Sequence, residues 1–334
     1  MKILLISSGY SGIYPYFEKA IEEAFILLDH QVIKINPEYT AAAVEIIERY
    51  KPDIIMTMVG YKMDQKLMEF LKKINSIRCI WLTEDPFYID MSLHLVRDYH
   101  YIFTIDLGAF EYFKKRFPQK NIYHLPLGTD PVLYYPIEPK EEYLYDVCLV
   151  GFPYPERIEL INQLLKHTPY SLIVVGPFWK KNIVNHKQNR SLTIINKWME
   201  PEWIRNQFNC SKIILNPHRS YKFSKNINTL EIENKSINNR TFDIAACGGF
   251  QLLSNKPDLE MHFETQDMVA YSCLEECIDL VNHYVNDEAS RDEYRKNALK
   301  RVMESHTFAH RVEFILKILR FNNSQNQSSE KFNK

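Results

Sequence analysis

No apolar stretch of this sequence approaches the ~18 residues that a membrane-spanning helix needs. The N-terminal run Ile3–Ile6 is too short for a signal peptide and is typical of a first β-strand. None of the six cysteines belongs to a C-x-x-C pair, and most lie inside apolar runs. These absences predict a cytoplasmic protein with reduced cysteines and without a membrane span.

The sequence also lacks an excess of charge of either sign, because its net charge is only −1. The first 135 residues carry 15 Lys and Arg against 17 Asp and Glu, and the remaining residues carry 26 against 25. Neither half is a basic module, which argues against a nucleic-acid partner.

The chain does have the size and composition for two domains, with 334 residues of which 46% are hydrophobic. In residues 1–135, apolar runs without polar alternation are separated by amphipathic stretches, which is typical of a doubly wound parallel sheet. The expected strands are Ile3–Ser7, Gln31–Ile35, Asp53–Val59, Arg78–Leu82, Tyr101–Ile105 and Asn121–Leu125.

The same pattern restarts after a proline-rich segment and the charged stretch Glu138–Glu142. We therefore expect an α/β protein with two tandem Rossmann-like domains that face a cleft, at 1–135 and 136–320. Residues 321–334, rich in Asn, Gln and Ser, are predicted to be a disordered tail. The expected strands of the second domain are Tyr145–Gly151, Ser171–Gly176, Lys212–Asn216, Phe250–Leu253 and Met268–Tyr271, and its last three helices are Leu274–Val285, Glu288–Glu304 and Phe308–Arg320.

Residues 238–253 are the most informative segment. Asn239 is expected to cap a short helix that ends at Gly248, and Arg240 and Asp243 share one face near its start. An arginine and free N–H groups there would suit a diphosphate, and the carboxylate would suit ribose hydroxyls. The alternative is an ordinary ion pair on a surface helix.

At this point the sequence resembles the GT-B glycosyltransferases, and in particular the spore-maturation CgeB group of group-1-type transferases. The linker His124–Pro131, the strand Asp146–Gly151 and the region Asn239–Arg311 carry the likeness. The resemblance implies a nucleotide-sugar donor in the C-terminal domain and an acceptor (a sugar, a glycan or a protein surface) in the N-terminal one. It also implies a final helix that crosses back to the first domain, and no cofactor beyond the co-substrate.

Relatives with the group-1 architecture carry two glutamates eight residues apart. Here Asp243 occupies the second position and Lys235 the first, with Glu231 and Glu233 nearby in the same loop. The chain also lacks an Asp-x-Asp motif, so we expect arginine, lysine and helix dipoles rather than a metal to meet the charge of the diphosphate.

Candidate donor-binding residues follow the strands of the second domain. They are Gly151 and Arg157 in a phosphate-loop position, Gly176 with Phe178 or Trp179 near the base, and His218 with Arg219 before a long polar loop (221–236). Each has an alternative as an exposed helix residue, as core packing or as a surface insertion.

In the first domain, Gly9 and Gly12 follow the first strand and would let the backbone approach the donor or the acceptor. Glu84 and Asp85 follow the fourth strand as candidate bases, with Asp85 preferred because proline follows it. The prediction is therefore a metal-independent glycosyltransferase. The alternatives are a non-catalytic GT-B-like protein in surface-layer or spore assembly, and a nucleotide-sugar epimerase.

Overall fold

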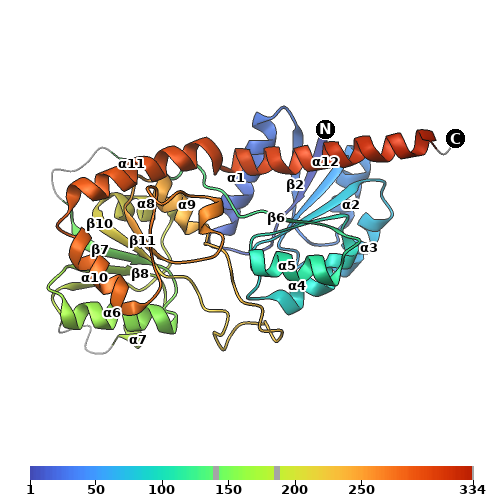
Figure 1. Ribbon diagram of the computed structural model, residues 1–334. Coiled ribbons are helices and arrows are strands. Elements are labelled where there is room, and N and C mark those ends of the chain that lie inside the picture. Colours follow the sequence, from blue (N-terminus) through green and yellow to red (C-terminus); the bar gives the residue numbers. More distant parts are fainter. Residues whose placement is uncertain (138–142, 184–188, 333–334) are drawn as a thin grey trace.

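The computed structural model describes residues 1–137, 143–183 and 189–332, with the backbone alone for 321–332. Two α/β units lie side by side, each built on its own sheet (Figure 1). The first unit contains β1 (Lys2–Ile6), α1 (Tyr14–Leu27), β2 (Gln31–Ile35), α2 (Ala41–Tyr50), β3 (Ile54–Met58), α3 (Gln65–Lys72), β4 (Ile77–Leu82), α4 (Ile89–Leu95), η1 (Val96–Asp98), β5 (Tyr101–Thr104), α5 (Leu107–Arg116) and β6 (Asn121–His124).

The second unit begins after the linker. It contains β7 (Tyr145–Val150), α6 (Pro155–His167), β8 (Leu172–Val175), α7 (Trp179–Asn182), β9 (Leu192–Ile195), α8 (Pro201–Asn209), β10 (Ser211–Asn216), α9 (Arg240–Ala246), β11 (Gln251–Ser254), η2 (Leu259–Met261), β12 (Val269–Tyr271), α10 (Leu274–Tyr284), α11 (Glu288–Ser305) and α12 (Phe308–Phe332).

The first sheet is parallel, with the strand order β2-β1-β3-β4-β5-β6. Because side chains alternate along a strand, β1 contributes to a core on each face of the sheet. Ile3 and Leu5 pack toward α1 and α12, whereas Leu4 and Ile6 pack toward α2 and α3. This burial on both faces explains the uninterrupted apolar runs of the sequence.

The second sheet is also parallel, with the order β12-β11-β10-β7-β8-β9. Here Val147 and Leu149 of β7 pack with α6 and α10, whereas Cys148 packs with α8 and α9. The order reverses between β7 and β10 in this sheet, and between β1 and β3 in the first. In doubly wound sheets, ligands bind at such switch points, beyond the carboxyl ends of the strands.

The last helix crosses from the second unit back to the first, as expected. α12 runs along α1 on the outside of the first sheet (Figure 1). Its side chains Phe308, Val312, Ile315 and Leu319 are buried in the same core as β1 and α1. The C-terminal helix therefore clamps the two units together.

The expected strands and long helices all form, with small shifts at their ends. Five short elements were not predicted: α4, η1, α7, η2 and the edge strand β9. β9 is only half-buried and follows a polar stretch, so it lacks the long apolar run that identifies the central strands. Among the described residues, no helix is long and apolar enough to cross a membrane.

The C-terminal end differs from the prediction. The structure continues α12 to Phe332, through most of the stretch 321–334 that was expected to be disordered. Residues 321–332 contain no proline or glycine, so nothing in them stops a helix. The expected linker segment Glu138–Glu142 lies outside the described residues.

The packing of α12 leads to a first prediction. Ile315→Ala should lower the free energy of unfolding by about 2–5 kcal/mol, because Ile315 is fully buried against the first unit. Urea unfolding followed by circular dichroism measures this. Lys317→Ala, at an exposed position of the same helix, is the matched control and should change stability by less than about 0.5 kcal/mol. Equal effects of the two variants would contradict the clamp.

Candidate functional site

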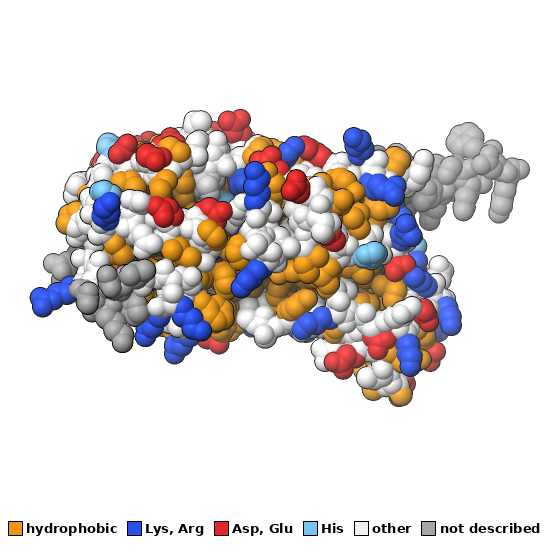
Figure 2. Space-filling model, turned by 90° about the horizontal axis from the view of Figure 1, so that it is seen from below, with side chains coloured by type: hydrophobic (Ala, Val, Ile, Leu, Met, Phe, Trp, Pro, Cys, Tyr) orange, Lys and Arg blue, Asp and Glu red, His pale blue; other side chains and the backbone are white. Residues whose placement is uncertain are grey.

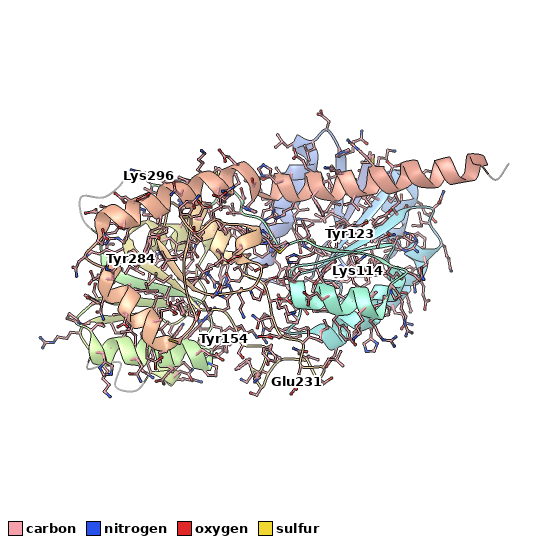
Figure 3. All side chains as sticks on the ribbon, in the orientation of Figure 1. Lys114, Tyr123, Tyr154, Glu231, Tyr284 and Lys296 are labelled. Atoms are coloured by element: carbon pink, nitrogen blue, oxygen red, sulfur yellow. The ribbon has the colours of Figure 1, made fainter. Side chains whose placement is uncertain are left out.

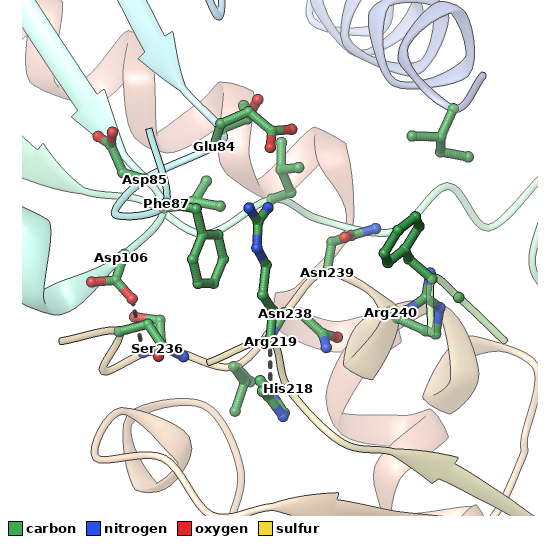
Figure 4. A pocket seen from close by; sticks show the side chains of 18 of the residues that line it. Glu84, Asp85, Phe87, Asp106, His218, Arg219, Ser236, Asn238, Asn239 and Arg240 are labelled. Atoms are coloured by element: carbon green, nitrogen blue, oxygen red, sulfur yellow. Dashed lines mark hydrogen bonds between the residues drawn. The ribbon is translucent and has the colours of Figure 1, made fainter. Parts of the chain in front are cut away.

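The carboxyl ends of the two sheets meet at one cavity of about 260 Å³. The first unit supplies the turn after β4, and the second supplies the turns after β7 and β10 and the residues that lead into α9 (Figure 4). Seen from below, hydrophobic side chains gather in the hollowed middle of the molecule, between the two units (Figure 2). Predicted site residues that line this main cavity are Glu84, Asp85, Gly151, Arg157, His218, Arg219, Asn239 and Arg240.

A second cavity, of about 310 Å³, adjoins the first on the side of the second unit. Gly176, Trp198 and Asp243 line it. The two cavities share Ile13, Gly151, Phe152, Asn239 and Arg240 as a common wall. A ligand that occupied both cavities would therefore pass directly beside Gly151 and Arg240.

Gly151 belongs to this wall and has a φ of 141°, a value that favours glycine. A Cβ at Gly151 would be 2.3 Å from Nη1 of Arg157, and a Cβ at Gly176 would be 2.2 Å from the carbonyl oxygen of Gly151. Gly151 is thus required by its φ and by the close Arg157 guanidinium, and Gly176 by the close approach of the Gly151 backbone. The indole of Trp179 donates to the Gly151 carbonyl at 2.8 Å and holds the turn.

Arg157 is buried, and its guanidinium donates hydrogen bonds to backbone carbonyls. Its Nε and Nη2 donate to the carbonyl of Pro217 at 3.0 and 2.7 Å, and its Nη1 donates to the carbonyl of Phe152 at 3.1 Å. Burial and the neighbouring charge of Arg240 lower the pKa of Arg157 to about 10. Arg157 therefore ties the turn after β7 to the turn after β10.

Arg240 is a cation of the site that lacks a partner within the described part of the chain. Among the described residues its guanidinium has no hydrogen-bond or ion-pair partner, and its Nη1 would lie 3.4 Å from a Cβ on Gly151. Burial lowers its pKa, an effect that the charge of Asp243 opposes. An arginine remains protonated in such surroundings, so Arg240 places a positive charge, without a counter-ion from any described residue, in the wall between the cavities.

Asp243 reaches the second cavity but is held by protein groups. Thr129 of the linker donates to one carboxylate oxygen at 2.9 Å, and Asn239 donates to the other at 3.1 Å. Burial raises the pKa of Asp243 to about 7. The cap of α9 also differs from the prediction, because Asn238 rather than Asn239 accepts from the N–H of Thr241, at 3.2 Å. Asn238 already occupies the N–H of Thr241 at the start of this short helix. We therefore expect an anion to bind the guanidinium of Arg240 rather than the helix end.

His218 is a fixed, neutral ring. Its Nδ1 contacts Ser254 Oγ at 2.9 Å, and its Nε2 accepts from the backbone N–H of Asn238 at 3.1 Å. Burial lowers the pKa of His218 well below its usual value. The ring therefore orients the segment that leads into α9.

Arg219 projects across the main cavity toward Glu84 (Figure 4). Its guanidinium lies 4.5 Å from the ring centre of Phe87 and 5.3 Å from that of Tyr154, in an aromatic surround. Its buried Nε has no hydrogen-bond partner among the described residues. Arg219 thus combines a fixed position with unused donor capacity.

The geometry distinguishes the two candidate bases, Asp85 and Glu84, by their hydrogen bonds. Asp85 is 1% exposed, and its two carboxylate oxygens accept from Ser92 Oγ at 2.5 Å and Thr104 Oγ1 at 2.9 Å. Glu84 is only half-buried, and its carboxylate accepts from the hydroxyl of Tyr14. Both carboxylates line the main cavity, but hydrogen bonds occupy both oxygens of Asp85, so Glu84 is the more available of the two.

Four other candidates do not line the two cavities. Phe178 is 49% exposed at the surface, while the neighbouring Trp179 is buried. Gly9 lies beside Lys62, which donates to its carbonyl, and Gly12 lies next to Trp198 at the edge of the second cavity.

Lys235 is the fourth. It turns away from the site and pairs with Glu111 at 2.6 Å. The nearby loop carboxylates Glu231 and Glu233 are exposed, and Glu231 lies at the outer end of the loop (Figure 3). In this segment Asn234, Ser236 and Asn238 face the main cavity instead.

Sequence reasoning missed Lys197, Trp198 and Met199, which line the second cavity. They follow the unpredicted strand β9, and recognition of Leu192–Ile195 as a strand would have placed them at the carboxyl edge of the sheet. Between α11 and α12, His306 Nδ1 contacts Arg311 at 2.9 Å, and burial lowers the pKa of His306 to about 3.

Solved structures confirm the class of fold. Sucrose-phosphate synthase from Thermosynechococcus elongatus matches with a TM-score of 0.69 at 12% identity, over 97% of this chain and 100% of that one. An alpha-glucosyltransferase in complex with UDP matches with a TM-score of 0.69 at 12% identity, over 96% and 99%. HepE of Anabaena, in complex with UDP and glucose, matches with a TM-score of 0.65 at 13% identity, over 96% and 99%. The two facing units form the GT-B fold of glycosyltransferases.

Sequence comparison then gives the family. The glycosyl transferase-like family model matches residues 157–317. The spore protein CgeB of Bacillus subtilis (strain 168) is 32% identical over 309 residues, which cover 92% of this chain and 95% of that protein. The chain belongs to the CgeB family of glycosyl transferase-like proteins.

The buried carboxyl of Asp85 leads to a second prediction. Its pKa is raised to about 7, mainly by burial, against about 3.9 in an unfolded chain. The folded state therefore binds the proton more tightly, and this contribution to stability is lost as the pH rises from about 4 to about 7. Relative to Asp85→Asn, the wild type should lose about 1.4 kcal/mol of unfolding free energy per pH unit in that window. Urea unfolding at pH 5 and pH 8 measures the difference.

The matched control is Asp279→Asn, at an exposed position of α10. The difference in unfolding free energy between this variant and the wild type should not change between pH 5 and pH 8 as it does for Asp85→Asn. A wild type that gains stability over Asp85→Asn as the pH rises would show that the native carboxyl is ionised.

Proposed function

We propose that this protein transfers a sugar from a nucleoside-diphosphate sugar to an acceptor hydroxyl. The observation that carries the proposal is the unpartnered Arg240 in the wall between two adjoining cavities, beside Gly151. The nucleoside would occupy the second cavity near Trp198, and the diphosphate would cross the wall at Arg240. The sugar would then lie in the main cavity. The neighbouring structures that contain UDP support a nucleotide-sugar donor.

The transfer step requires the bond between the anomeric carbon and the diphosphate oxygen to break, with its electron pair passing to the diphosphate. A bond forms between the acceptor oxygen and the anomeric carbon, and the acceptor proton passes to Glu84. Arg240 stabilises the charge of the departing diphosphate, and Arg219 lies across the cavity as a second cation. Burial raises the pKa of Glu84, which suits a group that must accept a proton near neutral pH.

We further propose that the reaction proceeds without a divalent metal or another cofactor, and that the protein works in the cytoplasm. The two arginines at the main cavity support the first point, because they supply the positive charge that a metal supplies elsewhere. The six free cysteines support the second, since reduced thiols are typical of that compartment.

A second candidate function is a non-catalytic member of the family that binds a nucleotide. The observation that favours it is Lys235, which stands where group-1 relatives have a glutamate and which pairs with Glu111 instead. Release of the sugar from UDP-glucose and other nucleotide sugars, followed by chromatography, separates the two. Turnover by the wild type supports the transferase, and binding without turnover supports the second candidate.

The phosphate role of Arg240 gives a third prediction. Arg240→Ala should weaken UDP binding about 10- to 100-fold, since a hydrogen bond to a charged group contributes about 1.5–3 kcal/mol. Isothermal titration with UDP, GDP, ADP and dTDP measures this and identifies the base. The matched control is Lys235→Ala, which removes a cation outside the cavities and should leave the affinity unchanged. Equal affinities of Arg240→Ala and the wild type would remove the phosphate role.

The base role of Glu84 gives a fourth prediction. Glu84→Gln should lower kcat about 10²- to 10⁴-fold while UDP affinity is preserved, because the amide cannot accept the proton. Wild-type activity should fall as the pH falls through the raised pKa of Glu84, since only the carboxylate is active. Asp85→Asn should retain most of the turnover. Full activity of Glu84→Gln, or loss only in Asp85→Asn, would exclude Glu84 as the base.

A further inference from the structure

A third cavity, of about 220 Å³, lies at the carboxyl edge of the first sheet. Its lining consists of four tyrosines and one carboxylate: Tyr10, Tyr14, Tyr61, Tyr88 and Glu84. Tyr10 and Tyr61 follow β1 and β3, the two strands between which the sheet order reverses. The fold thus gathers these side chains from separate segments of the first unit.

This tyrosine cavity adjoins the main cavity. Tyr14 and Glu84 line both, so they form the wall between the two spaces. A group bound among the tyrosines would therefore meet a group in the main cavity at the Glu84 carboxylate.

The cavity offers flat apolar walls with polar tips. Tyr10 and Tyr14 have ring centres 5.5 Å apart, and Tyr61 and Tyr88 have ring centres 6.1 Å apart. The hydroxyls of Tyr14 and Tyr61 are engaged by Thr83 at 3.0 Å and by Ser92 at 2.8 Å, which fixes both rings.

Two hydroxyls remain for a ligand. Tyr10 and Tyr88 have no side-chain hydrogen bond within the part of the chain that the structure describes. Tyrosine binds well where a ligand has an apolar face and a polar rim, because its ring packs while its hydroxyl bonds.

Charges of both signs border the site: Lys62 Nζ lies 4.2 Å from the ring centre of Tyr10, and the Arg219 guanidinium lies 5.5 Å from that of Tyr88. Glu84 is its one acid, the Tyr14 hydroxyl donates to it, and the charge of Arg219 across the main cavity opposes the rise in its pKa. A cationic ligand would have to compete with Arg219 for this carboxylate. The two cations disfavour a cationic ligand, and, among the described lining residues, the single acid with the free tyrosine hydroxyls suits a ligand that carries hydroxyl groups.

We propose that the tyrosine cavity is the acceptor subsite and that it takes a single neutral sugar ring. This inference rests on the transferase function proposed above. The volume is below the ~300–1,000 Å³ of sites for drug-sized ligands, which suits one ring. The apolar face of the ring packs on the tyrosines, and one of its hydroxyls reaches Glu84. The acceptor is therefore a saccharide rather than a protein surface.

The test uses the full chain with saturating UDP and saturation-transfer NMR. The probes are the methyl α-glycosides of glucose, galactose and mannose, with choline as a cationic aromatic-cage ligand. We expect at least one glycoside to bind and choline to bind more weakly. Tyr10→Ala and Tyr88→Ala should each weaken glycoside binding about tenfold, with UDP affinity unchanged. Tyr88→Phe, which keeps the ring, should retain part of the affinity.

Tyr39→Ala is the matched control, because Tyr39 is an exposed tyrosine of the same unit outside the cavity. Failure of all three glycosides while UDP binds would overturn the saccharide subsite and leave the proposed function standing. Tighter binding of choline, or equal losses in Tyr39→Ala and Tyr88→Ala, would also overturn it. Loss of UDP binding by the wild type would instead count against the proposed function.

Discussion

The site depends on how two crossing segments of chain hold the two units together. The chain passes from the first unit to the second through residues 125–136 and returns through residues 306–311. The two segments pair at Thr129 and Thr307, and a Cβ at Gly128 would lie 2.6 Å from the backbone carbon of Thr307. Only glycine permits this approach. Thr129 also donates to Asp243 of α9, so the same crossing fixes Arg240 relative to the first unit.

Burial decides which charged groups remain available in the site. Asp85 and Asp243 accept hydrogen bonds on both carboxylate oxygens, and Arg157 donates to backbone carbonyls. The hydrogen-bonding atoms of these groups are already occupied by protein partners, and burying a charge in the interior is unfavourable. Arg240 and Glu84 have not, and they stand on walls shared between cavities. Availability, more than charge, therefore separates binding groups from structural ones.

The sequence predicts the fold well because the central strands are buried on both faces, which leaves a long apolar signal. It also places Arg240 and Gly151 at the carboxyl edge, since both follow from where strands and helices end. It cannot rank Glu84 against Asp85, because that choice depends on Ser92 and Thr104, which approach only in three dimensions. Lys235 was misplaced for a similar reason: its partner Glu111 is 124 residues away in the chain. The strand β9 is only half-buried and was not predicted from the sequence, so the cavity residues around Trp198 that follow it were missed.

The substitution at Lys235 gains a physical interpretation from the cavity lining. Without a glutamate there, the second unit presents only neutral side chains, Asn234, Ser236 and Asn238, at this part of the main cavity. Asp106, which also lines it, accepts from the backbone N–H groups of Ala109, Lys235 and Ser236 and is thereby saturated.

Among the acids that line the main cavity, Glu84 is thus the one whose carboxylate still faces open space. It belongs to the first unit and also forms the wall of the tyrosine cavity. Because this carboxylate belongs to the first unit, the alignment of the two units controls its distance from Arg240 and the other cavity-lining residues of the second unit. The crossing at Thr129 and Thr307 is therefore a requirement of the site as well as of the fold.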